Sequence, residues 1–67
     1  MESIIKSIET LGFYQTGRDT SINAISVDHD DIDTDDQIWI EYQDGEYIVS
    51  GSNHPLVEEL EDYLFSL

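Results

Sequence analysis

Two runs rich in β-branched and aromatic residues flank an Asp-Gly pair, and this pattern constrains the fold more than any other. The runs lie in residues 37–50 (QIWIEYQDGEYIVS), and the central Asp44-Gly45 pair is typical of a two-residue type I′ hairpin turn. The turn sets a register in which residue 43 faces residue 46 and residue 40 faces residue 49. Because side chains alternate along a strand, the core face should carry Ile38, Ile40, Tyr42, Tyr47 and Val49, and the outer face Trp39, Glu41, Gln43, Glu46, Ile48 and Ser50.

Helical periodicity appears on both sides of this hairpin. Apolar residues recur at helical spacing over residues 2–11, and Gly12 suits the positive φ that ends many helices. A second apolar stripe predicts a helix over residues 55–65, with Pro55 in its first turn and its acids in solvent. Between the first helix and the hairpin, Phe13 and Tyr14 are expected to be core aromatics. Residues 15–19 are expected to form a turn and residues 20–27 a strand, with part of 13–16 as an alternative extended segment.

These elements predict a small two-layer α+β domain over residues 1–67. The order is helix, strand, strand, strand, helix (αβββα), and both helices should cover one face of a three-stranded antiparallel sheet to bury their stripes. The other face is then open to solvent or to a partner. The chain has no Cys, so packing without disulfides must hold the fold.

The charge balance indicates a cationic partner. The chain carries 16 Asp and Glu against only Lys6 and Arg18, for a net charge of −14. Such self-repulsion destabilises a compact state. One explanation of the many acids is that they only keep the protein soluble. A disordered chain is the other, but 39% of the residues are hydrophobic and recur in periodic patterns, which argues against disorder. Binding to nucleic acid or to anionic lipid is disfavoured, and the N-terminus lacks the pattern of a signal peptide, so a cytoplasmic protein is expected.

The acids concentrate between residues 28 and 46. An extended segment would present Asp31, Asp33 and Asp35 as a row with roughly 6.6 Å between neighbours, resembling the regular charge of duplex DNA. Trp39 on the outer face would serve as an apolar anchor, unless the acidic loop or the aromatics at 13–14 fold over it and Ile48. The predicted partner-binding residues are Asp28, Asp30, Asp31, Asp33, Asp35, Asp36, Trp39, Glu41, Asp44 and Glu46.

Neither catalysis nor a dedicated metal site is expected, and no cofactor is predicted. His29 lies in the acidic run, where it should be solvated, and His54 lies at a helix start, where it should cap. Residues 31, 33 and 35 match the first three ligand positions of an EF-hand loop. The match fails at position six, which is Asp36 instead of Gly, and at position twelve, which is Tyr42 instead of Glu.

The hairpin at 37–50, the following LVEEL segment at 56–60 and the opening IIKSI segment at 4–8 together resemble the small acidic phage anti-CRISPR proteins. The nearest likeness is to an inhibitor of a type II CRISPR nuclease. The acidic run at 28–36 and the lack of a further C-terminal helix depart from that family. The resemblance implies a monomeric DNA mimic whose acids engage the Lys and Arg residues that read the PAM.

The resemblance leaves the partner open. A type II nuclease and the large subunit of a type I Cascade complex are both candidates, because acidic anti-CRISPR proteins act on either. The other candidate partners are a restriction enzyme, a nucleoid protein, a repressor, or a basic nuclease neutralised by its immunity protein or antitoxin. A calcium-responsive module is the alternative from another class.

Overall fold

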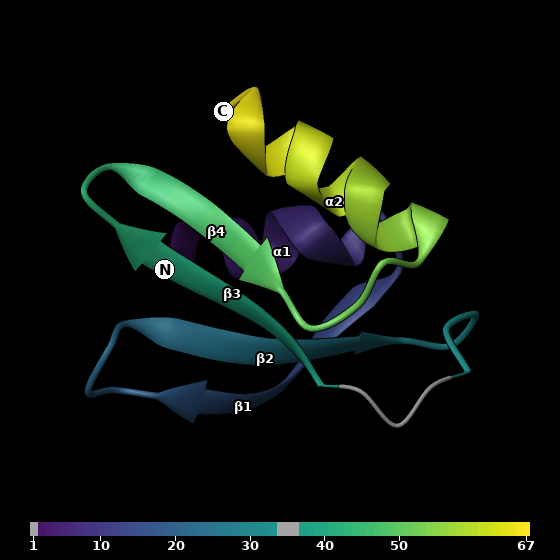
Figure 1. Cartoon of the computed structure of the whole chain (residues 1–67), viewed down its shortest axis with the longest axis horizontal. Helices are drawn as coiled ribbons and strands as arrows, with labels where there is room; N and C mark the ends of the chain where they lie inside the picture. Colours follow the sequence, from purple (N-terminus) through teal and green to yellow (C-terminus); the bar gives the residue numbers. More distant parts are fainter. Residues whose placement is uncertain (1, 34–36) are drawn as a thin grey trace.

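A four-stranded antiparallel sheet and two helices form two layers in the structure, a computed structural model that describes residues 2–33 and 37–67 (Figure 1). The sheet order β1-β2-β3-β4 follows the chain, so each strand pairs with its sequence neighbour. The elements are α1 (Glu2–Glu9), β1 (Phe13–Asp19), β2 (Ala24–His29), β3 (Ile38–Gln43), β4 (Glu46–Ser50) and α2 (Pro55–Phe65).

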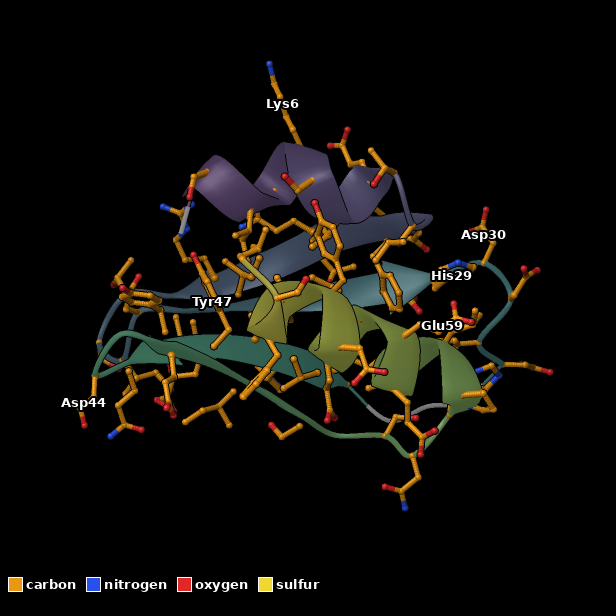
Figure 2. All side chains as sticks on the ribbon, turned by 90° about the horizontal axis from the view of Figure 1, so that it is seen from above. Lys6, His29, Asp30, Asp44, Tyr47 and Glu59 are labelled. Atoms are coloured by element: carbon orange, nitrogen blue, oxygen red, sulfur yellow. The ribbon has the colours of Figure 1, made fainter. Side chains whose placement is uncertain are left out.

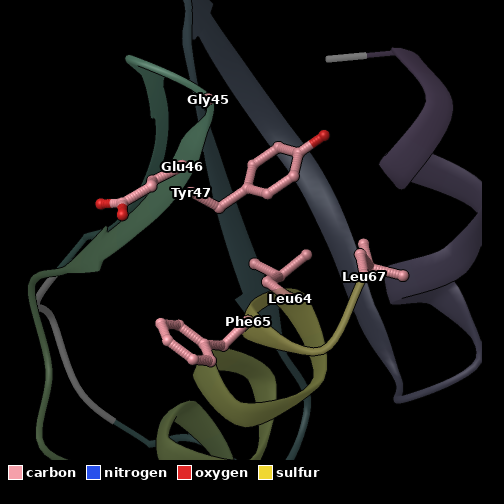
Figure 3. A pocket seen from close by; sticks show the side chains of 6 residues that line it. All are labelled: Gly45, Glu46, Tyr47, Leu64, Phe65 and Leu67. Atoms are coloured by element: carbon pink, nitrogen blue, oxygen red, sulfur yellow. The ribbon is translucent and has the colours of Figure 1, made fainter.

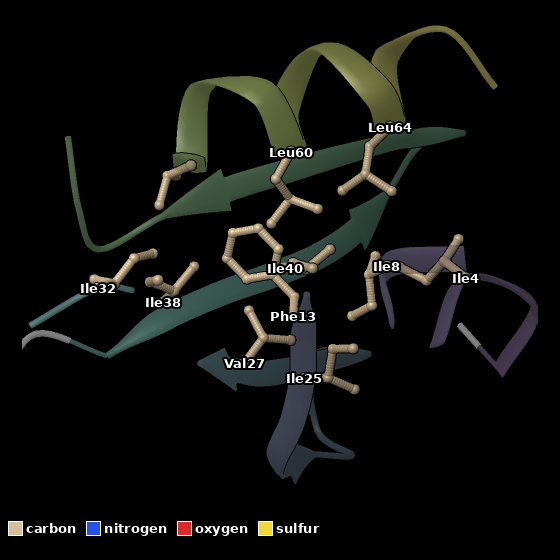
Figure 4. Close-up of a cluster of buried hydrophobic side chains, with 11 residues drawn as sticks. Ile4, Ile8, Phe13, Ile25, Val27, Ile32, Ile38, Ile40, Leu60 and Leu64 are labelled. Carbon is tan, nitrogen blue, oxygen red and sulfur yellow. The ribbon is translucent and has the colours of Figure 1, made fainter. Parts of the chain in front are cut away.

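Both helices cover the same face of the sheet. Ile25 of β2 and Ile40 of β3 are cross-strand partners, and both are completely buried. They belong to one apolar cluster with Ile8 of α1 and Leu60 of α2, which Figure 4 shows from the side. The expectation of a small α+β domain with its helices on one face is therefore confirmed, with one more strand than predicted. The described cluster contains Ile4, Ile8, Phe13, Ile25, Val27, Ile32, Ile38, Ile40, Val57, Leu60 and Leu64.

The predicted hairpin and second helix are confirmed. Asp44 and Gly45 have φ values of 54° and 83°, as a type I′ turn requires. The register is the one that the turn predicts, from the Gln43–Glu46 pair to the Ile40–Val49 pair. The second helix has the predicted bounds, and the Nδ1 of His54 caps it by accepting a hydrogen bond from the Leu56 N–H at 3.1 Å.

The N-terminal half differs from the prediction. The first helix ends at Glu9, before the end of the predicted range. Backbone hydrogen bonds between residues three apart continue as far as Gly12, whose φ is 91°. Residues 15–19 belong to strand β1 and not to a turn, and the predicted strand at 20–27 is displaced to Ala24–His29. The sequence of β1 lacks a clear strand pattern, because an edge strand can be rich in polar residues and a bulge at Gln15/Gly17 interrupts its alternation. In β2, four consecutive residues are buried, so its sequence does not alternate between apolar and polar residues.

Two predicted core aromatics are exposed. Tyr14 is 43% exposed because it points away from the helices, on the side of the sheet opposite Phe13. Tyr42 is 39% exposed, although it lies on the helix side. It follows the last residue of β3 that pairs with β2, so its main neighbour is Tyr47, at a ring distance of 4.9 Å.

The acidic run at 28–36 is not simply a solvated loop. Asp28 and His29 end β2, and Ile32 is buried in the core at 6% exposure. The prediction of a solvated His29 is wrong, since its side chain is 9% exposed and packs edge-on against Phe13. Its Nδ1 accepts the Asp31 N–H at 3.0 Å, so its Nε2 carries the hydrogen and donates to the Leu11 carbonyl, also at 3.0 Å. His29 thus ties the end of α1 to the start of the acidic loop.

We expect Gly12→Ala to destabilise the protein by about 1–3 kcal/mol. The residue has a positive φ, and an added Cβ would lie 2.5 Å from the Nε2 of His29. Gly45→Ala is the matched control, because its φ is also positive but an added Cβ meets nothing within 4 Å. Urea unfolding followed by the fluorescence of Trp39 should therefore show the larger loss for Gly12→Ala. Equal losses would contradict the tight seating of His29.

Candidate protein-binding surface

The face of the sheet turned away from the helices gathers acids around exposed apolar side chains. Alternation along the strands places them there, because Ile25, Val27, Ile38 and Ile40 all point to the other side. We call this surface the open face. Its members are Tyr14, Asp19, Ala24, Ser26, Asp28, Trp39, Glu41, Glu46, Ile48 and Ser50.

A hollow of about 250 Å³ lies on the open face. Ala24, which is only 2% exposed, lies at its floor. Ser26 on the same face is covered, since its hydroxyl lies 2.9 Å from that of Thr16. The residues directly opposite Trp39 on the neighbouring strands are the small residues Ser26 and Ser50. The hollow is lined by Asp19, Ile22, Ala24, Trp39, Glu41 and Ser50.

Asp19 brings a preset carboxylate to this hollow. It ends β1, and its Oδ1 accepts hydrogen bonds from the Ser21 hydroxyl at 2.6 Å and the Ser21 N–H at 3.0 Å. These two bonds, the hydroxyl bond above all, hold the pKa of Asp19 below its ordinary value. The side chain is therefore ionised and oriented before any partner arrives.

Apolar groups stand beside the carboxylates. Ile22 in the turn between β1 and β2 is 50% exposed, and Ile48 of β4 is 43% exposed. Trp39 is half-buried, as is Glu41, which lies between Ala24 and Ile48 in the sheet register. The prediction that Trp39, Glu41, Glu46 and Ile48 share an outer face is confirmed.

Asp28 also lies on the open face, but internal bonds engage it. Its Oδ1 accepts the His29 N–H at 2.7 Å, and its carboxylate interacts with the hydroxyl of Tyr14, its cross-strand partner. Partial loss of hydration, then the charges of Asp28 and Asp30, raise the pKa of the Tyr14 phenol. Asp28 therefore helps to fix this end of the sheet.

The predicted acids that the structure describes outside the open face are not brought together with this hollow. Asp30, Asp31 and Asp33 are exposed in the segment after β2, whereas Asp44 lies at the opposite end of the molecule (Figure 2). The Ile32 N–H bonds to the His29 carbonyl at 3.0 Å, so residues 29–32 form a turn. The predicted spacing of an extended row thus does not apply at Asp31. Asp35 and Asp36 lie outside the described residues.

A second hollow, of about 270 Å³, has a different character. It lies between the β3–β4 turn and the end of α2, where Phe65 is 89% exposed (Figure 3). Tyr47, Leu64, Phe65 and Leu67 line it together with one carboxylate, Glu46, whose side chain extends away from Tyr47 and Leu64. The hollow on the open face differs in having two carboxylates, Asp19 and Glu41, beside a tryptophan.

Sequence reasoning missed three residues that complete the hollow on the open face. Asp19, Ile22 and Ala24 were assigned to a turn and to an incorrectly placed strand. An assignment of residues 13–19 to an edge strand would have identified them, because that strand places Asp19 directly beside Ala24.

No group of three or more His, Asp or Glu side chains in residues 2–33 and 37–67 could hold a metal ion. Over the same ranges, no helix has the length and apolarity needed to cross a bilayer.

No protein-family model, curated protein or solved structure matches the chain, so the family resemblance stays a prediction.

We expect Ser21→Ala to raise the pKa of Asp19 toward its ordinary value, because the variant loses the stronger of the two hydrogen bonds. A lowered carboxyl pKa stabilises the folded state at neutral pH, and this contribution is lost as the pH falls below about 4. The variant should therefore be less stable than the parent at pH 7, with the difference shrinking in acid. An NMR titration of the Asp19 carboxyl carbon measures the pKa, with Ser66→Ala as a control. An unchanged titration would contradict the role of Ser21.

Proposed function

We propose that this chain is an inhibitor that mimics DNA and occupies the basic nucleic-acid-binding surface of another protein. The observation that carries the proposal is the open face, where Asp19, Glu41 and Trp39 line one shallow hollow. A surface that only kept the protein soluble would not need exposed apolar groups among its acids. Aromatic anchors such as Trp are enriched at the positions that dominate binding in protein interfaces.

The net charge favours the same conclusion. At −14, the protein is attracted to a basic groove from a distance, and this attraction accelerates association at low salt. The same charge opposes binding to nucleic acid itself. The partner is therefore a protein with a cationic surface, such as the groove in which a protein holds nucleic acid through Lys and Arg.

The target that we propose is a CRISPR effector, on the strength of the resemblance to acidic phage anti-CRISPR proteins. Occupation of the PAM-reading site would prevent the effector from opening target DNA. The protein would act as a monomer in the cytoplasm of the bacterial host. A restriction enzyme, a repressor or a basic nuclease offers the same surface chemistry, and these are the alternatives that the experiments below separate.

Competition with DNA tests the proposal directly. We expect the protein to displace a labelled PAM-containing duplex from a purified type II effector or a type I Cascade complex, and to do so less well as salt rises. If about a tenfold excess over the effector left DNA binding unchanged in both systems, the CRISPR assignment would be wrong. Displacement of DNA from a restriction enzyme or repressor alone would then support the broader assignment.

Variants that each remove two charges should locate the interface. We expect Glu41→Gln with Glu46→Gln, on the open face, to weaken binding to the effector by about tenfold or more. Glu58→Gln with Glu59→Gln, on the exposed side of α2, should change affinity less than about twofold, because α2 lies on the other side of the sheet. Surface plasmon resonance measures both.

Two exposed acids of the segment after β2, Asp31 and Asp33, provide a separate comparison. Asp31→Asn with Asp33→Asn should mainly slow association and reduce its salt dependence, since these exposed acids lie away from the hollow. Equal losses for the open-face, loop and α2 pairs would indicate that only total charge matters. That result would contradict a localised binding surface.

A further inference from the structure

We propose that the hollow on the open face is a pocket for one arginine side chain of the partner, with the guanidinium stacked on Trp39 and paired with Asp19 and Glu41. This inference rests on the proposed function, and it specifies how the partner is recognised. The net charge alone would attract any cationic surface, whereas this pocket would bind one kind of side chain.

The lining of the hollow has the chemistry that a guanidinium requires. A cation is attracted to the face of an indole, and among aromatic rings the indole binds cations best. Carboxylates accept the parallel N–H donors of a guanidinium. Trp39 and Glu41 are two positions apart on β3 and so point to the same side, roughly 6.6 Å from each other. Asp19 approaches from β1, beyond Ala24.

The size of the hollow is suited to a single side chain. Pockets for cofactors and drug-sized ligands occupy about 300–1,000 Å³. At about 250 Å³, this hollow is smaller than that range. The small side chains of Ala24 and Ser50 in its lining leave room for an aliphatic stem, with Ile22 beside it.

The pocket is largely formed in the free protein. Two hydrogen bonds from Ser21 orient the Asp19 carboxylate. Glu41 is half-buried on the sheet, and Trp39 belongs to a strand that is paired on both sides. Groups that are already ordered lose less conformational entropy when they bind, and this favours affinity.

Arginine fits better than the other possible occupants. Lysine has a compact, strongly hydrated charge that neither stacks on a ring nor bridges two carboxylates in a plane. A second copy of this chain would bring its own Asp19 and Glu41 against the same acids if the open faces met. The cationic, planar arginine is complementary in both charge and shape.

Short peptides test the pocket on the intact protein. The probes are the acetylated and amidated tripeptides Gly-Arg-Gly, Gly-Lys-Gly and Gly-citrulline-Gly, the last being a neutral analogue of the first. Trp39 is the only Trp of the chain, so its fluorescence reports on the pocket itself. Backbone NMR shifts at Ala24 and Ser50 give a second readout. We expect millimolar binding of the arginine peptide, with the lysine peptide weaker by about fivefold and the citrulline peptide without effect.

Variants make the test specific. Glu41→Gln keeps the shape of the side chain and should weaken the arginine peptide by about fivefold, whereas Glu59→Gln on α2 should leave its affinity unchanged. Trp39→Phe, followed by NMR, should reduce the preference for arginine over lysine. Equal binding of the arginine and lysine peptides, or NMR shifts confined to α2 or the acidic loop, would overturn the proposal.

The pocket and the proposed function can fail separately. If Glu41→Gln abolished arginine-peptide binding but left inhibition of the effector intact, the pocket would not be the recognition site and DNA mimicry would stand. If the peptide bound as expected and no nucleic-acid-binding protein were inhibited, the pocket would stand and DNA mimicry would be wrong.

Discussion

The packing of both helices against one face of the sheet is the constraint on which the rest of this structure depends. Ile25 and Ile40 form the centre of that face, with Ile8 and Leu60 above them from the two helices. A chain of 67 residues has enough apolar side chains for one such core and not for a second. The opposite face of the sheet therefore remains uncovered, and the side chains that alternation sends there are available to a partner.

The same core explains how a charge of −14 is compatible with folding. Among the described residues, the buried polar side chains are Ser26 and His29, and no carboxylate is buried. His29 has both ring nitrogens satisfied, one by Leu11 and one by Asp31. It holds the acidic loop to the domain by neutral hydrogen bonds, while Ile32 anchors the loop in the core. The acids thus stay in water, where solvent and salt screen their repulsion.

Bulk charge and a shaped pocket would contribute differently to recognition. Distributed acids raise the rate of encounter with any basic protein, and this contribution falls as salt rises. A half-buried Trp beside two carboxylates discriminates by geometry and acts mainly on the lifetime of the complex. The open face offers both kinds of contribution within one sheet, with Asp19 oriented by Ser21 and Glu41 held between Ala24 and Ile48. Specificity for one cationic partner among many is easier to explain by this combination than by charge alone.

The sequence by itself determined the hairpin, its register and both helices, because the Asp44-Gly45 turn and the apolar stripes are local signals. It also placed Trp39, Glu41 and Glu46 on one face, since strand alternation follows directly from the turn. The edge strand Phe13–Asp19 was missed although it pairs with the next strand, because its polar residues and its bulge lack the pattern of a strand. Only the tertiary structure decided the burial of His29 and Ile32, because the groups that cover them lie elsewhere in the chain. It also decided the pocket, which requires Asp19 from β1 to meet Trp39 and Glu41 from β3 across β2. Long-range strand pairing leaves no local pattern, so the site became visible only when the sheet was assembled.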